Sequence, residues 1–381
     1  MTEYGTPDEI LAGRPEVSFY CTSCRRCDLA CPLDLSPSAA LFEAKERLIR
    51  DGQAPLPVKK ALDGARGFAK AGHGFPFSFY GKARTVFWPG CALAANRPDL
   101  IGKIRNALKA RLRRKIGLAL DCCYDPVYGL GDTQTARVAL QDINKHLHDH
   151  GVKQLITGCL NCYKLLSGHL EEIEVVFILD VLPAELFEKH WPQAAYLHHP
   201  CPSSRWNDLM TKANGAFRQL PISAADTQFG SSESPAALCC GNGGGVSASA
   251  PRLADRFLNQ IIEKAEEGTI VTYCFGCRNR FMNRGVKSIH LLEGLSGRAP
   301  GGKVASMPAQ WANRFMLAMT ARIKTVKFLV GILIVSLVLG GVYLTQQNVF
   351  SAEALTTLLG RYPVAAPLIF LCIYAVAPSL F

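Results

Sequence analysis

Short apolar runs alternate with longer helical segments through the middle of the chain, from about residue 84 to residue 300. A segment at residues 133–150 is typical of a helix, and Gly151 ends it. The runs that indicate buried strands are residues 85–87, 118–120, 154–156 and 269–271, and each leads into a cysteine. Strands that alternate with helices favour an α/β fold with mostly parallel sheets. Ligands in such sheets are presented at the carboxyl ends of the strands, so we expect a site formed by these cysteines.

A second helical pattern lies near the N-terminus. Ser36 stands at the N-cap position, Pro37 at the first helical position, and Gly52 ends the predicted helix. We interpret its apolar stripe as a packing face made of Leu41, Ala44, Leu48 and Ile49. Prolines, glycines and lysines then dominate residues 53–83, and we expect a linker there.

The composition changes after Glu293. Residues 301–327 hold five Lys or Arg and no acidic residue, which predicts a basic juxtamembrane segment. Residues 328–344 are uncharged and apolar, at the short end of the about 17–25 residues that cross a bilayer. We therefore expect one or more membrane segments in residues 328–381, with truncation at the end left open. A buried core helix is the alternative.

Charge and cysteine content limit the cellular setting. The net charge is +11, but the basic residues are scattered without an aromatic-rich basic strand or a recognition helix, which argues against a nucleic-acid partner. The chain starts without a basic and apolar signal segment, so its 15 cysteines are expected to be reduced and metal-bound. The basic flank of residues 328–344 favours the inner (cytoplasmic) membrane, with the cysteine-rich part facing the cytoplasm.

Four cysteines form an N-terminal run with the spacing C-x2-C-x2-C-x3-C-P, and they are Cys21, Cys24, Cys27 and Cys31. This spacing is typical of bacterial ferredoxins, in which close thiolates bind a 4Fe–4S cubane. A zinc knuckle is the alternative. In two-cluster ferredoxins the fourth cysteine serves the other cluster, yet one such run is present. Cys31 therefore closes the same cluster, serves a cluster shared with another chain, or is unused, and we favour the first.

Ten further cysteines form two sets in the order Cys, Cys-Cys, Cys-x-x-Cys. The first set is Cys91, Cys122, Cys123, Cys159 and Cys162. The second set is Cys201, Cys239, Cys240, Cys274 and Cys277. They form an internal repeat of about 110 residues. One tetrahedral zinc takes only four ligands, whereas a polynuclear iron–sulfur cluster can accept five thiolates. The fifteenth cysteine, Cys372, lies in the apolar C-terminal part.

Both sets resemble the cysteine-rich "CCG" domain found in the B-type subunits of heterodisulfide reductases. Relatives of that domain include iron–sulfur subunits of glycolate oxidase, lactate utilisation enzymes and anaerobic glycerol-3-phosphate dehydrogenase. The second repeat is the better match, because residues 198–201 (His-His-Pro-Cys) are similar to the family's entry segment, and His290 with Glu293 to its closing segment. The first repeat departs from the pattern, with Tyr124 in place of the glycine and Val175 at the spacing of His290.

The resemblance implies one or two non-cubane 4Fe–4S clusters at these motifs, with zinc at one of them as the alternative. The N-terminal run is similar to the second half of a ferredoxin domain of the heterodisulfide reductase C type. The glycines of residues 241–245 lack dinucleotide-binding spacing, and we interpret them as a close approach of backbone N–H groups to the cluster. Residues 362–378 resemble the opening of a DedA/SNARE-associated Golgi protein membrane domain.

The expected domain order follows from these patterns: a ferredoxin-like domain at 1–52, a linker at 53–83, CCG domains at 84–190 and 191–300, a basic segment at 301–327 and membrane segments at 328–381. The leading hypothesis is a membrane-tethered iron–sulfur oxidoreductase subunit that relays electrons between a partner flavoprotein dehydrogenase and a quinone or other acceptor. The alternative is a heterodisulfide reductase-type enzyme that cleaves a disulfide at a CCG cluster. A metal-stabilised scaffold is the third class, and the cysteine content exceeds its structural need. No catalytic residue is assigned.

Overall fold

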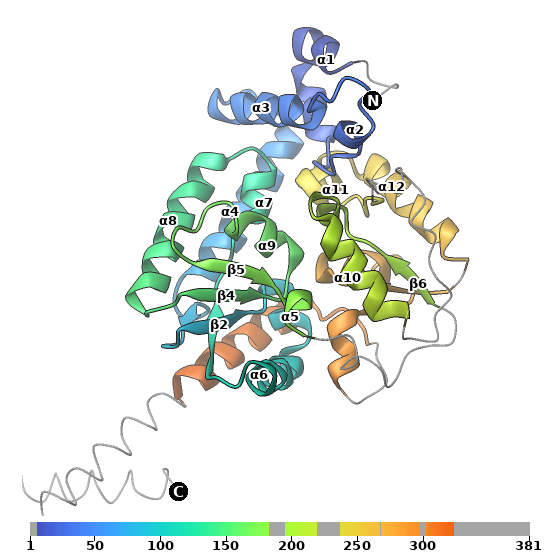
Figure 1. Cartoon of the computed structure of the whole chain (residues 1–381). Helices are drawn as coiled ribbons and strands as arrows, with labels where there is room; N and C mark the ends of the chain where they lie inside the picture. Colours follow the sequence, from blue (N-terminus) through green and yellow to red (C-terminus); the bar gives the residue numbers. More distant parts are fainter. Residues whose placement is uncertain (1–5, 183–194, 219–236, 267, 297–301, 324–381) are drawn as a thin grey trace, which may run out of the picture. The chain divides into compact units, whose positions relative to one another are not determined.

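The computed structural model of the chain describes residues 6–182, 195–218, 237–266, 268–296 and 302–323. The chain divides into two compact units, Met1–Ala318 and Met319–Phe381. The sheets, the helices labelled in Figure 1 and the three groups of cysteines expected to bind a cofactor all lie in the first unit.

The first repeat is built on a five-stranded sheet with the order β1-β3-β2-β4-β5. Its strands are β1 (Phe79–Tyr80), β2 (Thr85–Trp88), β3 (Ile116–Leu120), β4 (Gln154–Thr157) and β5 (Glu174–Phe177). All neighbouring pairs are parallel except β1 and β3. The strands β2 and β3 are buried throughout, as expected for a sheet covered on both faces. The parallel α/β prediction is confirmed for this repeat.

Helices connect these strands and cover the sheet (Figure 1). They are α5 (Cys91–Asn96), α6 (Pro98–Leu112), α7 (Asp125–Gly129), α8 (Thr133–Asp149) and α9 (Leu160–Leu166). Leu140, Ile143 and Leu147 of α8 share one apolar cluster with Val86 of β2 and Leu155 of β4. The helix expected at residues 133–150 is therefore present, and its apolar face forms part of the core.

The second repeat has a three-stranded parallel sheet with the order β6-β7-β8. Its elements are β6 (Ala195–His198), η4 (Cys201–Arg205), α10 (Asn207–Arg218), η5 (Gly243–Gly245), α11 (Val246–Ser249), α12 (Pro251–Lys264), β7 (Thr269–Thr272), α13 (Phe275–Met282), β8 (Ser288–His290) and η6 (Leu291–Ser296). Leu258 and Ile261 of α12 pack with Phe281 of α13 and Ile270 of β7. The same βα order thus places both cysteine sets at the carboxyl ends of strands.

The N-terminal part is helical. It contains α1 (Pro7–Gly13), η1 (Pro15–Tyr20), α2 (Arg26–Leu29) and α3 (Pro37–Arg50). The helix expected after Ser36 is α3, although the Ser36 side chain makes no capping hydrogen bond. Leu41, Ala44 and Leu48 are buried, as the stripe predicts. Gly52, with a φ of 69°, follows the last turn.

The linker expected at residues 53–83 is wrong for most of that range. Residues Leu56–His73 form α4, and Phe79–Tyr80 form β1. Proline is compatible with the first turn of a helix, where its missing N–H has no partner to lose, and this helix has proline in its first turn. Val58, Leu62 and Ala69 are buried, so burial of this face outweighs the cost of the exposed glycines.

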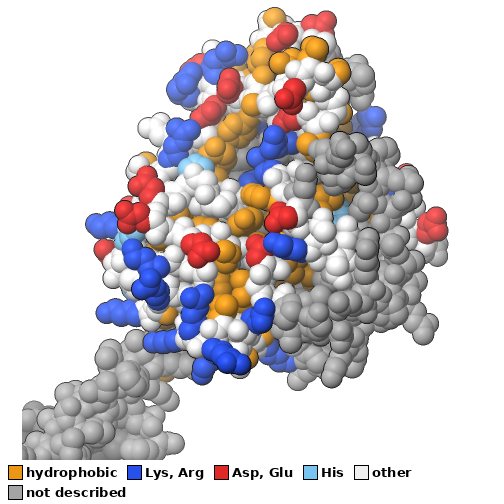
Figure 2. Space-filling model, in the orientation of Figure 1, with side chains coloured by type: hydrophobic (Ala, Val, Ile, Leu, Met, Phe, Trp, Pro, Cys, Tyr) orange, Lys and Arg blue, Asp and Glu red, His pale blue; other side chains and the backbone are white. Residues whose placement is uncertain are grey.

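The membrane segments expected in residues 328–381 lie outside the described residues. Among the helices that the structure describes, none is long and apolar enough to cross a bilayer. On the face shown in Figure 2, Lys and Arg side chains are interspersed with Asp and Glu, which agrees with the scattered charge of the sequence.

Candidate functional site

The N-terminal run lies on a loop around the short helix α2. Ser23 and Arg25 have positive φ angles of 56° and 62°, which turn the backbone tightly. Burial raises the pKa of Cys24 to about 11 and that of Cys27 to about 12, and the charge of Cys21 contributes to both shifts. These three thiols are therefore close enough to repel one another when ionised. Participation of Cys31 stays a prediction.

Asp28 ties this loop to α3. Its carboxylate accepts hydrogen bonds from the backbone N–H of Ser38 (2.8 Å), from the Ser38 hydroxyl (2.6 Å) and from Arg25 Nε (3.1 Å). Burial alone would raise the pKa of Asp28, but the two bonds from Ser38 lower it overall. The loop conformation is thus fixed by a charged group outside the cysteines.

The structure brings the second cysteine set together at one edge of the second sheet. The sulfurs of Cys201 and Cys239 lie 3.7 Å apart, and those of Cys240 and Cys277 lie 3.3 Å apart. Cys274 follows β7 as the N-cap residue of α13 and acts electrostatically on Cys277. Hydrogen bonding raises the pKa of both Cys201 and Cys277. The five thiols expected to act together do lie together.

Cys239 differs from its neighbours. Hydrogen bonding from Cys201 lowers the pKa of Cys239 to about 6, and bonds from Thr22, Gly241 and Gly243 act in the same direction. The Gly241 N–H donates to Cys239 Sγ over 3.3 Å. Backbone donors at a ligand sulfur tune the potential of a metal group, so this contact supports the role that we expected for the glycines.

The first cysteine set is also gathered. Cys123 interacts with Cys91 and Cys162, Cys159 with both of these, and Cys122 with Cys91 and Cys123. Their pKa values are raised where shifts are resolved: burial raises that of Cys91 to about 12 and that of Cys122 well above its usual value, and the bond to Cys123 is the main cause at Cys162.

Tyr124 keeps the backbone of the glycine that it replaces. Its φ is 62°, and that of Gly241 in the second repeat is 80°. The left-handed conformation that follows the Cys-Cys pair is therefore retained, at the strain cost that a side chain brings. The ring of Tyr124 packs edge-on against His73, with 5.7 Å between centroids. The departure from the family pattern at this position does not disperse the five thiols.

The N-terminal loop packs directly against the glycine-rich turn of the second repeat. A Cβ at Gly243 would lie 2.4 Å from the carbonyl oxygen of Thr22, and one at Gly244 would lie 2.4 Å from that of Cys21. Contacts this close exclude any side chain. Cys24 and Cys239 act electrostatically on each other across this junction, and Thr22 hydrogen-bonds with both. Two groups of cysteines that are far apart in the sequence are thus neighbours.

Lys45 of α3 is enclosed at this junction. Its side chain is fully buried, and Nζ donates to the carbonyl oxygen of Cys21 (2.6 Å) and more weakly to that of Gly244 (3.4 Å). A Cβ at Gly131 of the first repeat would lie 2.9 Å from the Lys45 carbonyl carbon. Lys45 therefore contacts the N-terminal loop and both repeats. We did not single it out from the sequence, although a lysine between Ala44 and Leu48 in an apolar stripe was the available signal.

Replacing Lys45 by methionine should make the N-terminal group harder to reduce. A buried ammonium stabilises the extra negative charge of the reduced state, and we expect the reduced fraction at a fixed potential to fall about tenfold, or about 59 mV for one electron. Redox titration followed by EPR measures this shift. Arg47→Met removes the same charge from an exposed position of the same helix. Equal potentials in the two variants would contradict the assignment.

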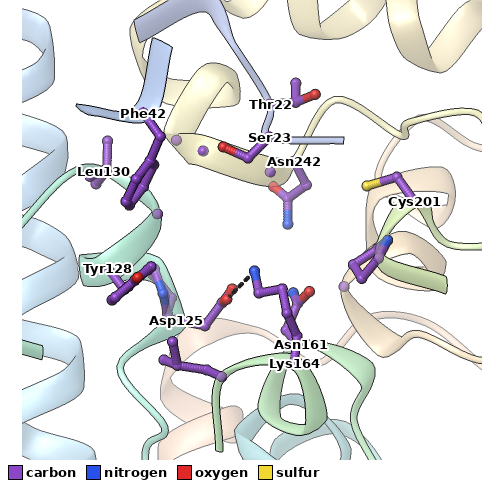
Figure 3. Close-up of a pocket in the computed structure, with 18 of the residues that line it drawn as sticks. Thr22, Ser23, Phe42, Asp125, Tyr128, Leu130, Asn161, Lys164, Cys201 and Asn242 are labelled. Atoms are coloured by element: carbon purple, nitrogen blue, oxygen red, sulfur yellow. Dashed lines mark ion pairs between the residues drawn. The ribbon is translucent and has the colours of Figure 1, made fainter. Parts of the chain in front are cut away.

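A cavity of about 630 Å³ opens beside the second cysteine set. Figure 3 shows it between three parts of the chain: Thr22 and Ser23 of the N-terminal loop, Asn161 and Lys164 of the first repeat, and Cys201 of the second. The remaining thiols at its wall are Cys240, Cys274 and Cys277. The volume is within the range of small-molecule sites, about 300–1,000 Å³, so there is room for an inorganic group and a small ligand.

The cavity wall is polar and charged. Lys164 Nζ lies 2.6 Å from the Asp125 carboxylate, and Figure 3 shows this pair directed into the space. Burial opposes protonation of Lys164, but Asp125 raises its pKa overall. Burial lowers the pKa of Arg205, and the neighbouring charge of Arg25 adds to the effect. These groups can orient a polar substrate beside the thiols.

The histidines that resemble the family's entry and closing segments are packing residues here. Burial lowers the pKa of His198 and His290 to about 3 and that of His199 to about 4. His290 stacks on Phe275, with 4.0 Å between centroids. Glu293 accepts from Arg278 Nε at 2.9 Å and lies 3.3 Å from Arg97 at the start of α6. The closing glutamate thus joins the two repeats.

The donor sets fit iron–sulfur groups. Thiols crowded in this way hold their protons because their charges repel, and bound iron would replace those protons. In the described ranges, no three or more His, Cys, Asp or Glu side chains are arranged to hold a single metal ion. His148 and His150 at the end of α8 instead bond to backbone carbonyl groups of Glu171 and His146.

Comparison with known proteins agrees with this site. Residues 85–167 and 195–282 match the family model described as CCG, cysteine-rich domain. These ranges contain both cysteine sets. The expected likeness of residues 362–378 to a DedA-type membrane domain finds no support in the comparisons.

Three relatives come from methanogenic archaea. The B-type subunit of fumarate reductase (CoM/CoB) from Methanothermobacter marburgensis is 24% identical over 295 residues, covering 71% of this chain and 58% of the relative. An uncharacterised iron–sulfur protein of Methanocaldococcus jannaschii is 25% identical over 207 residues (51% and 40%), and one of Methanococcus maripaludis is 23% identical over 282 residues (68% and 56%). The chain thus spans between 40% and 58% of the length of these relatives. It carries two CCG cysteine-rich domains and is homologous to iron–sulfur proteins of the kind found as B-type subunits in heterodisulfide and fumarate reductases.

Proposed function

We propose that the chain is an electron-transferring iron–sulfur subunit of an oxidoreductase, in which electrons pass between the N-terminal run and the second cysteine set. The observation that carries this proposal is the packing of the loop at Cys21 and Thr22 on Gly243 and Gly244, which places Cys24 beside Cys239. Close, enclosed redox sites are what a relay needs.

Named residues would hold the groups. Cys21, Cys24 and Cys27, with Cys31 as the fourth ligand, would bind a 4Fe–4S cubane. The two five-cysteine sets would each bind a non-cubane 4Fe–4S cluster, with zinc at one of them as the alternative. These groups supply one-electron transfer when bound. The chain's own residues enclose the junction, because Lys45, Gly131 and Gly244 leave no space for water-filled separation.

A partner redox subunit is part of this proposal. A flavoprotein dehydrogenase would supply hydride chemistry, and a quinone or other small acceptor would take the electrons. The relative from Methanothermobacter marburgensis is named as one subunit of a fumarate reductase (CoM/CoB), which is compatible with a redox assembly. Attachment to the cytoplasmic membrane through residues 328–344, with the iron–sulfur part in the cytoplasm, is likewise proposed from the sequence.

Disulfide cleavage is the second candidate, and the cavity favours it. Four thiols of the second set line a space that also holds Lys164, Asp125 and Asn161. A disulfide bound there would take two electrons and two protons, its S–S bond would break, and two thiols would leave. The electrons would arrive one at a time through the second set, while the polar wall orients the substrate.

Anaerobic reoxidation distinguishes these candidates. Iron-loaded full-length protein is reduced, freed of excess reductant, and mixed with either menadione or bis(2-hydroxyethyl) disulfide. Recovery of the oxidised absorption with menadione alone supports a relay to quinone. Recovery with the disulfide, with two thiols formed for each disulfide consumed, supports cleavage. Reduced protein that neither compound oxidises would contradict both.

A further inference from the structure

Arg314 carries a buried charge in helical residues 307–318. The residue is 5% exposed. Its guanidinium carbon lies 4.5 Å from the ring centroid of Trp311, 5.2 Å from that of Phe68 and 5.9 Å from that of Phe77. A guanidinium stays charged at any physiological pH. Aromatic faces compensate such a charge only in part.

The guanidinium is directed at the first cysteine set. A Cβ at Gly72 would lie 2.4 Å from Arg314 Nη2 and 3.2 Å from the Cβ of Cys122. Arg314, Cys91 and Gly90 line one small cavity. The pKa of Cys91 is raised to about 12 by burial, and the charge of Arg314 opposes that shift. The cation therefore lies where it stabilises thiolate charge.

Arg314 lacks a complete set of partners in the described part of the chain. Its Nη1 is buried and has no hydrogen-bond partner there. The nearby Asp121 carboxylate is already bonded to His73 Nδ1 (2.9 Å), to the Tyr80 hydroxyl and to the Cys122 N–H. Burying a charge without a counter-charge costs several kcal/mol. The remaining source of negative charge is the first cysteine set.

We propose that Arg314 is the counter-charge of an anionic metal–thiolate group held by the first cysteine set, and that docking of residues 307–318 depends on metal loading. This inference rests on the proposed function, because it requires a group at Cys91, Cys122, Cys123, Cys159 and Cys162. It goes beyond that function by linking the state of the site to a segment that contributes no cysteine. Arg314 acts as a positioning residue.

Hydrogen–deuterium exchange of residues 307–318 in the full-length protein tests this linkage. Loaded protein should protect the segment, and removal of iron should speed its exchange about tenfold or more, because loss of a buried charge pair lowers the free energy of local opening. Arg314→Gln should exchange fast even when loaded, and Arg314→Lys should fall between. Arg111→Gln, which removes an exposed charge from α6, should match the unmodified chain.

Iron and sulfide counts keep the two proposals apart. If Cys122→Ser binds as much iron as the unmodified chain, the first set holds no group, and both proposals fail at this site. If Cys122→Ser loses iron but the exchange of residues 307–318 ignores loading, only the linkage is overturned. Protection that persists in loaded Arg314→Gln overturns it as well.

Discussion

A methyl group at position 244 should separate the N-terminal loop from the second repeat. In Gly244→Ala the new Cβ would lie 2.4 Å from the Cys21 carbonyl oxygen and 2.8 Å from Lys45 Nζ. The φ of 59° adds strain for a residue with a side chain. Together these effects should lower the free energy of unfolding by about 2–4 kcal/mol. Electron exchange between the N-terminal run and the second set should slow, because the two sites move apart.

Chemical denaturation and the reduction kinetics of the loaded protein measure these effects. Gly64→Ala is a matched control, since Gly64 lies in α4 with nothing within 4 Å of its added Cβ. Alanine favours a helix over glycine, so this control should stabilise the protein by about 0.5–1 kcal/mol. If Gly244→Ala unfolds and transfers electrons like Gly64→Ala, the packing at the junction is not what the structure shows.

Replacement of one thiol in the second set should remove one whole group. Cys240 is buried and its sulfur lies 3.3 Å from that of Cys277. Cys240→Ser should lower the iron content by about four atoms per chain and abolish disulfide turnover. The EPR signal of the N-terminal run should persist, because the sequence assigns it a separate set of ligands.

Cys372→Ser is the control, since that cysteine belongs to neither pattern. It should bind the same iron as the unmodified chain, expected at about 8–12 atoms for two or three 4Fe–4S groups. Loss of both signals in Cys240→Ser would mean that the two sites do not fold separately. An unchanged iron content would show that the ligand assignment is wrong.

The strands and the two cysteine sets could be predicted because their signals are local. The apolar runs at residues 85–87 and 269–271 became β2 and β7, and the spacing of the cysteines grouped them as the structure does. The helix α4 was missed because Pro55 and Pro57 indicate an interruption, although both positions precede or begin the first turn. Its stability comes from burial of Val58 and Leu62 against other segments, which local pattern does not contain.

The junction at Lys45 could not be predicted for the same reason. Its contacts with Cys21 and Gly244 join residues separated by 24 and 199 positions. The glycines of residues 241–245 were expected to approach a cluster, and Gly241 does bond to Cys239. Gly243 and Gly244 serve chain packing as well, because another backbone fills the space of their missing side chains.

Magnetic interaction between the N-terminal run and the second cysteine set tests the central claim most directly. Loaded, fully reduced protein is studied by EPR at low temperature, with Cys240→Ser as the reference that lacks the second group. Adjacent sites predict an N-terminal signal that is broadened and relaxes fast in the unmodified chain and becomes narrow and slow in the variant. An N-terminal signal that is the same in both proteins would contradict a direct path between the two sites.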